Sequence, residues 1–421
     1  MCITPPVGVE LAGYGFGPSV GVLDELEAQA LYLSDGHTEI AVLCADVLTV
    51  GADFARAVRS GIESTLGIPG SHVLICASHS HSSPTLMPLR QWGQVDRSYA
   101  SLVEARLVEA TAVARRNAVP ARMGAGLGHL DTLSENRRGA AGLIDPALPV
   151  LRFDTADGTP LAVLYGFGCH PVSLHSYRNL LSPDYPGYAR KVVRRILGCD
   201  AAVMFCLGPA GDVNPAGYRP GETTPERSAQ IGTGVGCAVA KVALVSRYVA
   251  EPTLALAGAT LQLPVAELPP EPELITMRDT SATAAERARA QGQPWVQISE
   301  LEIKRDWAID ALRERERGPA RTVPCELTAL RIGEALMVAM PLEVFTRTGL
   351  DIRSALRDRV VVISTNSNGG VGYLPTEDAY RTQDYTNPQG LAPKVYGVYA
   401  LAQEAEPLVR ERTLALLRSL A

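Results

Sequence analysis

Short runs of branched apolar residues alternate along this chain with longer stretches in which apolar residues recur every three or four positions. The short runs predict buried strands, and the longer stretches predict amphipathic helices. Strands are expected at 39–47, 71–76, 121–126, 150–154, 161–167, 201–207, 253–263, 325–332, 335–340 and 360–364. Helices are expected at 52–66, 98–117, 185–197, 227–249, 344–356 and within 391–420. This alternation predicts a mixed α/β protein whose sheets are flanked by helices.

The pattern changes at the proline-rich segment 268–272, which is typical of a stiff connector. Residues 280–318 are rich in alanine and in charge. We therefore expect a charged helical insertion at about 273–320 that forms one or two solvated helices and has no chemical role. The candidate site residues described below lie on both sides of it, which favours one structural unit covering 1–421.

Composition narrows the classes of function. The 421 residues are 46% hydrophobic and 20% charged, and the net charge is -6. A mild acidic balance without a basic tract argues against nucleic acid as the main partner. No apolar window approaches the ~20 residues that span a bilayer, so membrane insertion is not expected.

The N-terminus and the cysteines indicate the cellular compartment in which the protein is expected. The first residues lack a basic region followed by an apolar stretch, so no signal peptide is expected. The eight cysteines are scattered and form no C-x-x-C pair. Cys44, Cys76 and Cys206 lie inside apolar runs and read as small buried hydrophobic residues. Reduced cysteines predict a cytoplasmic protein.

The triplet His79-Ser80-His81 follows the apolar run 72–76. Imidazoles at positions i and i+2 of a strand would point to the same face, at the edge of the sheet where open α/β proteins place their sites. Neutral imidazole is a common zinc ligand. Zinc needs more ligands than one triplet supplies, and the pair could equally cap a turn.

Three more expected strands end in polar residues. His170 follows 161–167, Asp212 lies in a tight Gly- and Pro-rich loop after 201–207, and Glu343 follows the strand ending at 340. Tyr373 sits in a further glycine-rich loop. Each residue alone could be an ordinary turn residue or cap. Together they are typical of a site at one edge of a sheet.

These residues lie in segments that resemble the neutral ceramidases, in particular the N-terminal catalytic domain of neutral/alkaline non-lysosomal ceramidases and their shorter bacterial relatives. The segments occur in the family's order and span most of the chain. They are Ser78-His79-Ser80-His81-Ser82-Ser83-Pro84, Asn136-Arg137, His170-Pro171-Val172-Ser173-Leu174, Ser182-Pro183-Asp184-Tyr185-Pro186-Gly187-Tyr188-Ala189, Gly211-Asp212-Val213-Asn214-Pro215, Pro341-Leu342-Glu343-Val344-Phe345 and Gly372-Tyr373-Leu374-Pro375-Thr376. The resemblance implies a ceramidase-like catalytic domain, here without the C-terminal immunoglobulin-like domain of those enzymes.

The resemblance also implies one catalytic zinc ion. Its ligands map to His79, His170, Glu343 and Tyr373. His81 would lie beside the metal as a neighbour or proton handler, and Arg137 would bind the substrate carbonyl. A second tyrosine, Tyr385, would help to polarise the carbonyl oxygen.

The loop around Asp212 is expected to contact substrate. Gly211 and Asn136 are candidate substrate-binding residues, and Asp212 or His81 could carry a proton to the leaving amine. Asp46 could orient a ligand histidine or simply cap a turn. Asn214 stands where the ceramidases carry a serine. Because asparagine cannot act as a nucleophile, this change favours metal-activated water over a covalent serine mechanism.

The sequence thus predicts a zinc-dependent amidohydrolase that cleaves an amide (N-acyl) bond, linear or cyclic, of a small intracellular molecule. One alternative uses the same metal site for amide or lactam formation or for acyl transfer in a biosynthetic pathway. Another is a degenerate metal-binding homologue without activity. A serine hydrolase is disfavoured, because neither Ser80 nor Ser173 lies in a Gly-x-Ser-x-Gly elbow.

Overall fold

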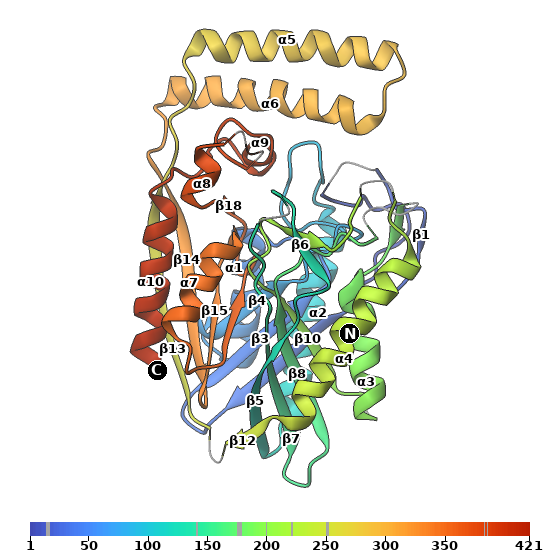
Figure 1. The fold of residues 1–421 in the computed structure, drawn as a ribbon, viewed down its shortest axis with the longest axis vertical. Coiled ribbons are helices and arrows are strands. Elements are labelled where there is room, and N and C mark those ends of the chain that lie inside the picture. Colours follow the sequence, from blue (N-terminus) through green and yellow to red (C-terminus); the bar gives the residue numbers. More distant parts are fainter. Residues whose placement is uncertain are drawn as a thin grey trace.

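The computed structural model describes residues 1–13, 17–139, 142–174, 179–198, 200–219, 222–249, 252–382, 384 and 386–421. Three main sheets pack on one another, and helices cover their outer faces (Figure 1). The predicted mixed α/β fold with flanking helices is confirmed. That residues 1–421 form one domain stays a prediction.

The first sheet has three strands, β2 (Ala28–Ser34), β3 (Glu39–Ala45) and β4 (Val73–Ala77). Strand β3 runs antiparallel to β2 and parallel to β4. Helices α1 (Ala52–Leu66) and α2 (Arg97–Arg116) pack on this sheet through a buried apolar cluster. Both faces of β3 are buried, which explains why its sequence is an almost continuous apolar run.

The second sheet has five strands in the order β10 (Ala202–Leu207), β8 (Pro160–Phe167), β7 (Ala147–Thr155), β5 (Ala121–His129) and β12 (Arg247–Val249). Strands β8 and β10 are parallel. Helices α3 (Tyr185–Leu197) and α4 (Pro225–Val245) cover its outer face. By length and composition α4 could cross a membrane, but half of its apolar window is buried here and it contributes Ile231, Val235 and Val239 to the core.

The third sheet has four strands, β13 (Leu254–Pro264), β14 (Thr322–Ile332), β15 (Ala335–Ala339) and β17 (Val361–Ser364). Strands β14 and β15 form the hairpin that the sequence predicts, and β15 is parallel to β17. Helices α7 (Thr346–Ala355) and α10 (Ala405–Leu420) cover this sheet.

A central apolar core joins the three sheets. It contains Val42 and Leu74 from the first sheet, Leu164 and Met204 from the second, and Met337 and Val362 from the third, all fully buried. Burying one such side chain contributes about 1.5–3 kcal/mol. The core therefore holds the three sheets together.

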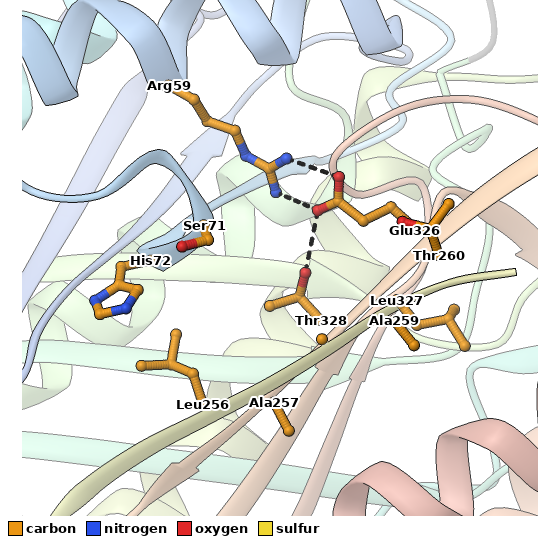
Figure 2. Close-up of a pocket in the computed structure, with 11 residues that line it drawn as sticks. Arg59, Ser71, His72, Leu256, Ala257, Ala259, Thr260, Glu326, Leu327 and Thr328 are labelled. Atoms are coloured by element: carbon orange, nitrogen blue, oxygen red, sulfur yellow. Dashed lines mark hydrogen bonds and ion pairs between the residues drawn. The ribbon is translucent and has the colours of Figure 1, made fainter.

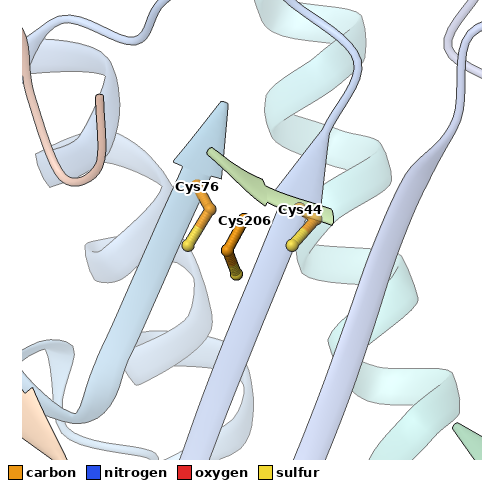
Figure 3. A group of neighbouring side chains, drawn as sticks. All are labelled: Cys44, Cys76 and Cys206. Atoms are coloured by element: carbon orange, nitrogen blue, oxygen red, sulfur yellow. The ribbon is translucent and has the colours of Figure 1, made fainter. Parts of the chain in front are cut away.

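Three cysteines pack in this core. Cys44 and Cys76 are partners on β3 and β4, and Cys206 of β10 lies against them, so that the three sulfur atoms are within 4.8 Å of one another (Figure 3). All three are free thiols. Their predicted burial is confirmed, and that they act only as small hydrophobic residues stays a prediction, because three sulfur atoms this close could also hold a metal ion.

The charged insertion forms a helical hairpin of α5 (Glu271–Ala290) and α6 (Trp295–Arg317). It projects from the sheets and lies above the short helix α9 (Ala392–Tyr396) in Figure 1. The two predicted helices are present, but α6 is not simply solvated. Its residues Ile303 and Trp307 are buried, because one face of the helix packs on the body of the protein.

The sequence pattern misplaced or missed some elements. The strand β2 was not expected, and the helix expected at 227–249 ends at Val245 because residues 247–249 form the edge strand β12. The helix expected to begin at 344 begins at Thr346. Two short strands, β16 (Leu342–Val344) and β18 (Gly372–Leu374), form a separate parallel pair. Glu343 therefore lies on a strand and does not open a helix.

Several short elements lie outside the three main sheets. They are β1 (Gly21–Val22) paired with β9 (Leu180–Leu181), β11 (Val213–Pro215) paired with β6 (Ser134–Asn136), the 3₁₀ turn η1 (Gly70–His72) and helix α8 (Glu377–Tyr380).

Candidate metal centre

His79 lies in the loop after β4. The strand ends at Ala77, so the triplet His79-Ser80-His81 does not continue it as the alternation argument assumed. His79 instead adopts a left-handed backbone conformation with φ 65°. This region is rare for residues other than glycine and persists only where the surroundings enforce it. Here the backbone N–H donates to Val47 O at 2.9 Å and the ring atom Nδ1 lies 2.7 Å from Leu48 O.

His170 lies in the loop after β8. Its Nδ1 is 2.6 Å from Ala210 O, and its backbone N–H donates to Val213 O at 3.1 Å. The buried carboxylate of Asp184 accepts from Leu174 N at 2.7 Å and from the Ser173 hydroxyl. Asp184 also precedes α3, so it ties the His170 loop to the start of that helix. This explains structurally why the segment around Asp184 carries part of the resemblance.

Glu343 faces both histidines. Its Oε2 lies 3.1 Å from Nε2 of His170 and 3.6 Å from Nε2 of His79, and its Oε1 accepts a hydrogen bond from the phenol of Tyr396. All these groups except Tyr396 are almost completely buried. Three segments that are far apart in the sequence thus place donor atoms around one point.

The hydrogen bonds fix the tautomers of both rings. A carbonyl oxygen only accepts, so Nδ1 of each ring carries the proton, and Nε2 of the neutral ring keeps a lone pair. Nε2 of His79 is buried and makes no hydrogen bond within the described part of the chain. Nε2 of His170, by contrast, makes a hydrogen bond with Oε2 of Glu343 at 3.1 Å, so it is the Nε2 lone pair of His79 that is left without a partner.

The ionisation states agree with this description. Burial lowers the pKa of His79 to about 4, although Glu343 opposes the shift, so the ring is neutral at neutral pH. Burial alone would raise the pKa of Glu343, but His79, His170 and Tyr396 outweigh it and lower the pKa to about 2. The neutral imidazole of His79, the neighbouring ring of His170 and an ionised carboxylate are a donor set that suits a divalent cation.

His81 completes a group of three histidines. Its ring centroid lies 5.0 Å from that of His79 and 5.8 Å from that of His170. The ligand nitrogens of the three rings lie within 4.8 Å of one another. The ring also packs against Gly13, where an added Cβ would come within 2.4 Å of Nδ1. His81 is thus placed beside the other two rings, as expected for a neighbour of the metal.

Tyr373 and Arg137 lie next to this group. Tyr373 is the register partner of Glu343 across β16 and β18. Its hydroxyl lies 3.2 Å from Nη2 of Arg137, which also donates to Gly211 O. Both residues line the same cavity as His79 and His81. Direct ligation by Tyr373 stays a prediction, because the contact seen for its hydroxyl is with Arg137.

The loop residues expected to touch substrate are placed differently. Asp212 accepts from Thr346 N and Oγ1, both at 2.8 Å, and from Nδ2 of Asn136 at 2.9 Å, so its carboxylate joins α7 to β6. Gly211 contributes its carbonyl to Arg137, and its N–H donates to Val344 O. Asn214 is nearly buried on β11. None of these four is among the residues that line the cavity, and a role in catalysis or substrate binding stays a prediction for each.

Two other expectations concern residues away from this point. Tyr385 lies outside the described residues. Asp46 pairs with Arg190, with Oδ2 2.9 Å from Nη2, and does not contact a histidine. The suggestion that Asp46 orients a ligand histidine is therefore wrong, because the backbone carbonyls of Leu48 and Ala210 perform that task.

A cavity of about 330 Å³ opens over His79, His81 and Glu343, whereas His170 is not among its lining residues. Its polar wall is formed by His79, His81, Arg137, Glu343, Tyr373 and Tyr396, and its apolar wall by Leu48, Leu89, Trp92, Leu391, Ala392 and Val395. Gly13 and Glu300 complete the lining. Sequence reasoning missed Tyr396, Trp92 and Glu300, since no local motif surrounds them and α6 was expected to be solvated.

A larger cavity of about 560 Å³ lies between α1 and the third sheet (Figure 2). Its charged groups, Arg59 and Glu326, form a bidentate ion pair with N–O distances of 3.0 and 2.7 Å. Nδ1 of His72 lies 2.9 Å from Glu39 O. These groups already satisfy one another, so the smaller cavity is the better candidate for chemistry.

Together, the fold and the donor set define a ceramidase-like architecture with a buried group that could hold a metal ion. The chain superposes over its whole length on neutral ceramidase from Pseudomonas aeruginosa, with a TM-score of 0.74, 16% identity and coverage of 73% of that chain. It superposes equally well on a ceramidase complexed with C2, with a TM-score of 0.74 and 16% identity over 74% of that chain.

The sequence comparison points to the same proteins. The chain is 28% identical to neutral ceramidase of Pseudomonas aeruginosa over 166 residues, which are 34% of this chain and 24% of that protein. The matched region thus spans about a quarter of that curated relative. No family model matches the chain. The resemblance to the neutral ceramidases that the seven segments indicate is confirmed.

Proposed function

We propose that this protein is a metal-dependent hydrolase, with zinc as the expected ion, that cleaves an amide bond of a small molecule. One observation carries the proposal. The Nε2 atoms of His79 and His170 converge on the ionised carboxylate of Glu343 inside a ceramidase-like fold. Nε2 of His79 is buried without a hydrogen-bond partner among the described residues, which is costly, and a cation bound between His79 and Glu343 would remove that cost.

His79, His170 and Glu343 would hold the ion, and Tyr373 is expected to complete its ligands. A bound divalent ion supplies Lewis acidity, which polarises a carbonyl and lowers the pKa of water from 15.7 towards ~7. Arg137 lines the cavity next to Tyr373 and would stabilise the charge that develops on the carbonyl oxygen. His81 would pass a proton to the departing amine.

The reaction consumes one water molecule and gives a carboxylic acid and an amine. The cavity of about 330 Å³ is at the small end of ligand pockets, which favours a compact substrate over a long-chain lipid amide. Asn214 in place of a serine supports the same choice. A cytoplasmic setting is also proposed, supported by the seven described cysteines, which are all free thiols.

The metal is tested first. Protein purified with zinc would be analysed by mass spectrometry for metal content, as wild type and as His79→Ala and Glu343→Ala. We expect about one zinc per wild-type chain and almost none in either variant. His129→Ala is the matched control, because that histidine is exposed and pairs with Asp131. Wild-type protein that binds no divalent metal would contradict the proposal and support a degenerate homologue.

The reaction is tested by product analysis. Zinc-loaded protein would be incubated with short N-acyl amides and with ceramide, and the products identified by chromatography and mass spectrometry. We expect acid and amine from the short amides. Robust ceramide cleavage without activity on short amides would overturn the substrate class. Formation of new amides from acid and amine precursors, without hydrolysis, would overturn the direction of the reaction.

A further inference from the structure

One charged residue of the cavity has no part in the chemistry above. Glu300 lines the cavity but comes from α6 of the helical hairpin, whereas the candidate metal ligands come from loops and short strands that follow the main sheets. Glu300 is half-buried. The helical hairpin therefore contributes a carboxylate to a cavity whose candidate metal ligands come from other elements.

The hairpin is anchored firmly enough to hold Glu300 there. Nε1 of Trp92 lies 3.3 Å from the hydroxyl of Ser299, the residue before Glu300. Two further contacts follow along the helix, between Gln91 and Asp306 at 2.7 Å and between Arg90 and Asp310 at 2.8 Å. Because one loop contacts α6 over three turns, Glu300 has a defined position over the cavity.

Glu300 lacks a partner of its own. No hydrogen bond or ion pair reaches its carboxylate within the residues that the structure describes. Its neighbour Glu302 shows the contrast. That side chain is buried, contacts Arg289 of α5 and lies 3.5 Å from Arg305. The same helix thus carries one glutamate that is engaged in the hairpin and one that faces the cavity unpaired.

The surroundings of Glu300 suit a cation. The nearby wall of the cavity is apolar and includes Leu89 and Val395, together with the indole of Trp92. Arg137, the cationic residue of the lining, is already in contact with Tyr373 and Gly211. A carboxylate beside an aromatic ring and apolar surface is a common way to bind an ammonium group.

We propose that Glu300 and Trp92 form a subsite for a positively charged amino group of the substrate. The substrate would then be a small amide that carries an ammonium group away from the bond that breaks. This inference rests on the proposed function, since it places a second recognition point in the same cavity.

The test uses two matched series of amides with the zinc-loaded chain. One series varies the end of the acyl part and the other the end of the amine part, and in each the end group is an ammonium, a hydroxyl or a methyl. In one of the series we expect kcat/KM for the ammonium compound to exceed that for the methyl compound by about 10- to 100-fold. The Glu300→Gln variant should lose this preference. Glu300→Lys should reverse it, so that the methyl compound becomes a better substrate than the ammonium compound.

Glu316→Gln is the matched control, since Glu316 is an exposed glutamate on the same helix. It should keep the full preference for the ammonium compound. Binding of ε-aminocaproamide and caproamide to metal-free protein, measured by calorimetry, gives a readout that is independent of turnover. The ammonium compound should bind about tenfold more tightly, and Glu300→Gln should abolish the difference.

The outcomes separate the two proposals. If all three end groups are hydrolysed equally well in both series, the subsite is wrong and the amidase proposal stands. If no amide is cleaved but the ammonium compound binds more tightly in a Glu300-dependent manner, the amidase proposal is wrong and the subsite stands. If neither cleavage nor selective binding is seen, both are wrong.

Discussion

Tyr396 donates its phenolic hydrogen to Oε1 of Glu343, the carboxylate oxygen that faces away from the two histidines. Both oxygens of the carboxylate are therefore in contact: the phenol of Tyr396 donates to Oε1, and the rings of His79 and His170 lie next to Oε2. The pKa of Tyr396 is raised well above its usual value by burial and by the charge of Glu343, so the phenol stays protonated and remains a donor.

Replacing Tyr396 by Phe should weaken zinc binding about 10- to 100-fold, because partners that orient a ligand carboxylate typically contribute that much. Competition with a chromophoric chelator would measure the affinity. Tyr399→Phe is a suitable control, since the hydroxyl of Tyr399 contacts Glu314 at 3.0 Å and lies outside the cavity lining. Equal affinity of Tyr396→Phe and wild type would show that Tyr396 does not support the metal centre.

Arg137 should affect the rate and not the metal. We expect Arg137→Gln to reduce kcat for a short amide by about 10²–10³, the usual effect of removing one donor to a developing oxyanion. The zinc content should stay at the wild-type level, because an arginine side chain stays protonated, only donates hydrogen bonds and is not a metal ligand. A variant with normal kcat would assign the carbonyl contact to another group.

Gly13 should matter through its contact with His81. It has φ +112°, and a Cβ there would lie 2.4 Å from Nδ1 of His81. Gly8 has a similar φ of +106° with open space around it. Both Gly13→Ala and Gly8→Ala should lose about 1 kcal/mol of stability from backbone strain. Only Gly13→Ala should also lose amidase activity, which melting curves and rate assays on both variants would check.

The pH dependence of stability should reflect Glu27. Burial alone would raise the pKa of Glu27, but Arg194 and Arg190 outweigh it and lower the pKa to about 2. A carboxyl whose pKa falls on folding stabilises the protein above its unfolded pKa of about 4.5, and this contribution is lost as the pH falls towards about 2.

The expected size is about 2–3 kcal/mol, reduced somewhat because the Glu27 side chain is 26% exposed. Urea unfolding of wild type and Glu27→Gln would measure it. The difference in free energy of unfolding should shrink between about pH 6 and about pH 3. A difference that is constant over this range would show that the Arg194 contact does not depend on the charge of Glu27.

Sequence reasoning located the parts of the site that follow strands. His79, His170 and Glu343 could be predicted because each is a polar residue directly after a buried apolar run, where the carboxyl ends of parallel strands meet. The reason for their geometry was not predictable. The left-handed turn at His79 and the carbonyl partners of both rings depend on loops that pack together only in the folded protein.

Other residues gave no signal in the sequence. Tyr396 lies on a five-residue helix without a motif, and its contact with Glu343 joins positions 53 residues apart. The strand β16 has only three residues and follows a proline, a pattern that favours the start of a helix over a strand. Helix α6 has charges on several faces, which hides the one face that packs on the body.

The hairpin of α5 and α6 leaves and re-enters the fold between neighbouring strand ends, since Pro264 of β13 pairs directly with Thr322 of β14. A segment inserted between adjacent points can be exchanged or shortened without shifting the strands that carry it. If the proposed function is right, selectivity could be changed through this hairpin while the candidate metal ligands stay the same. Grafting another hairpin at the same junction would then be a direct route to a different substrate preference.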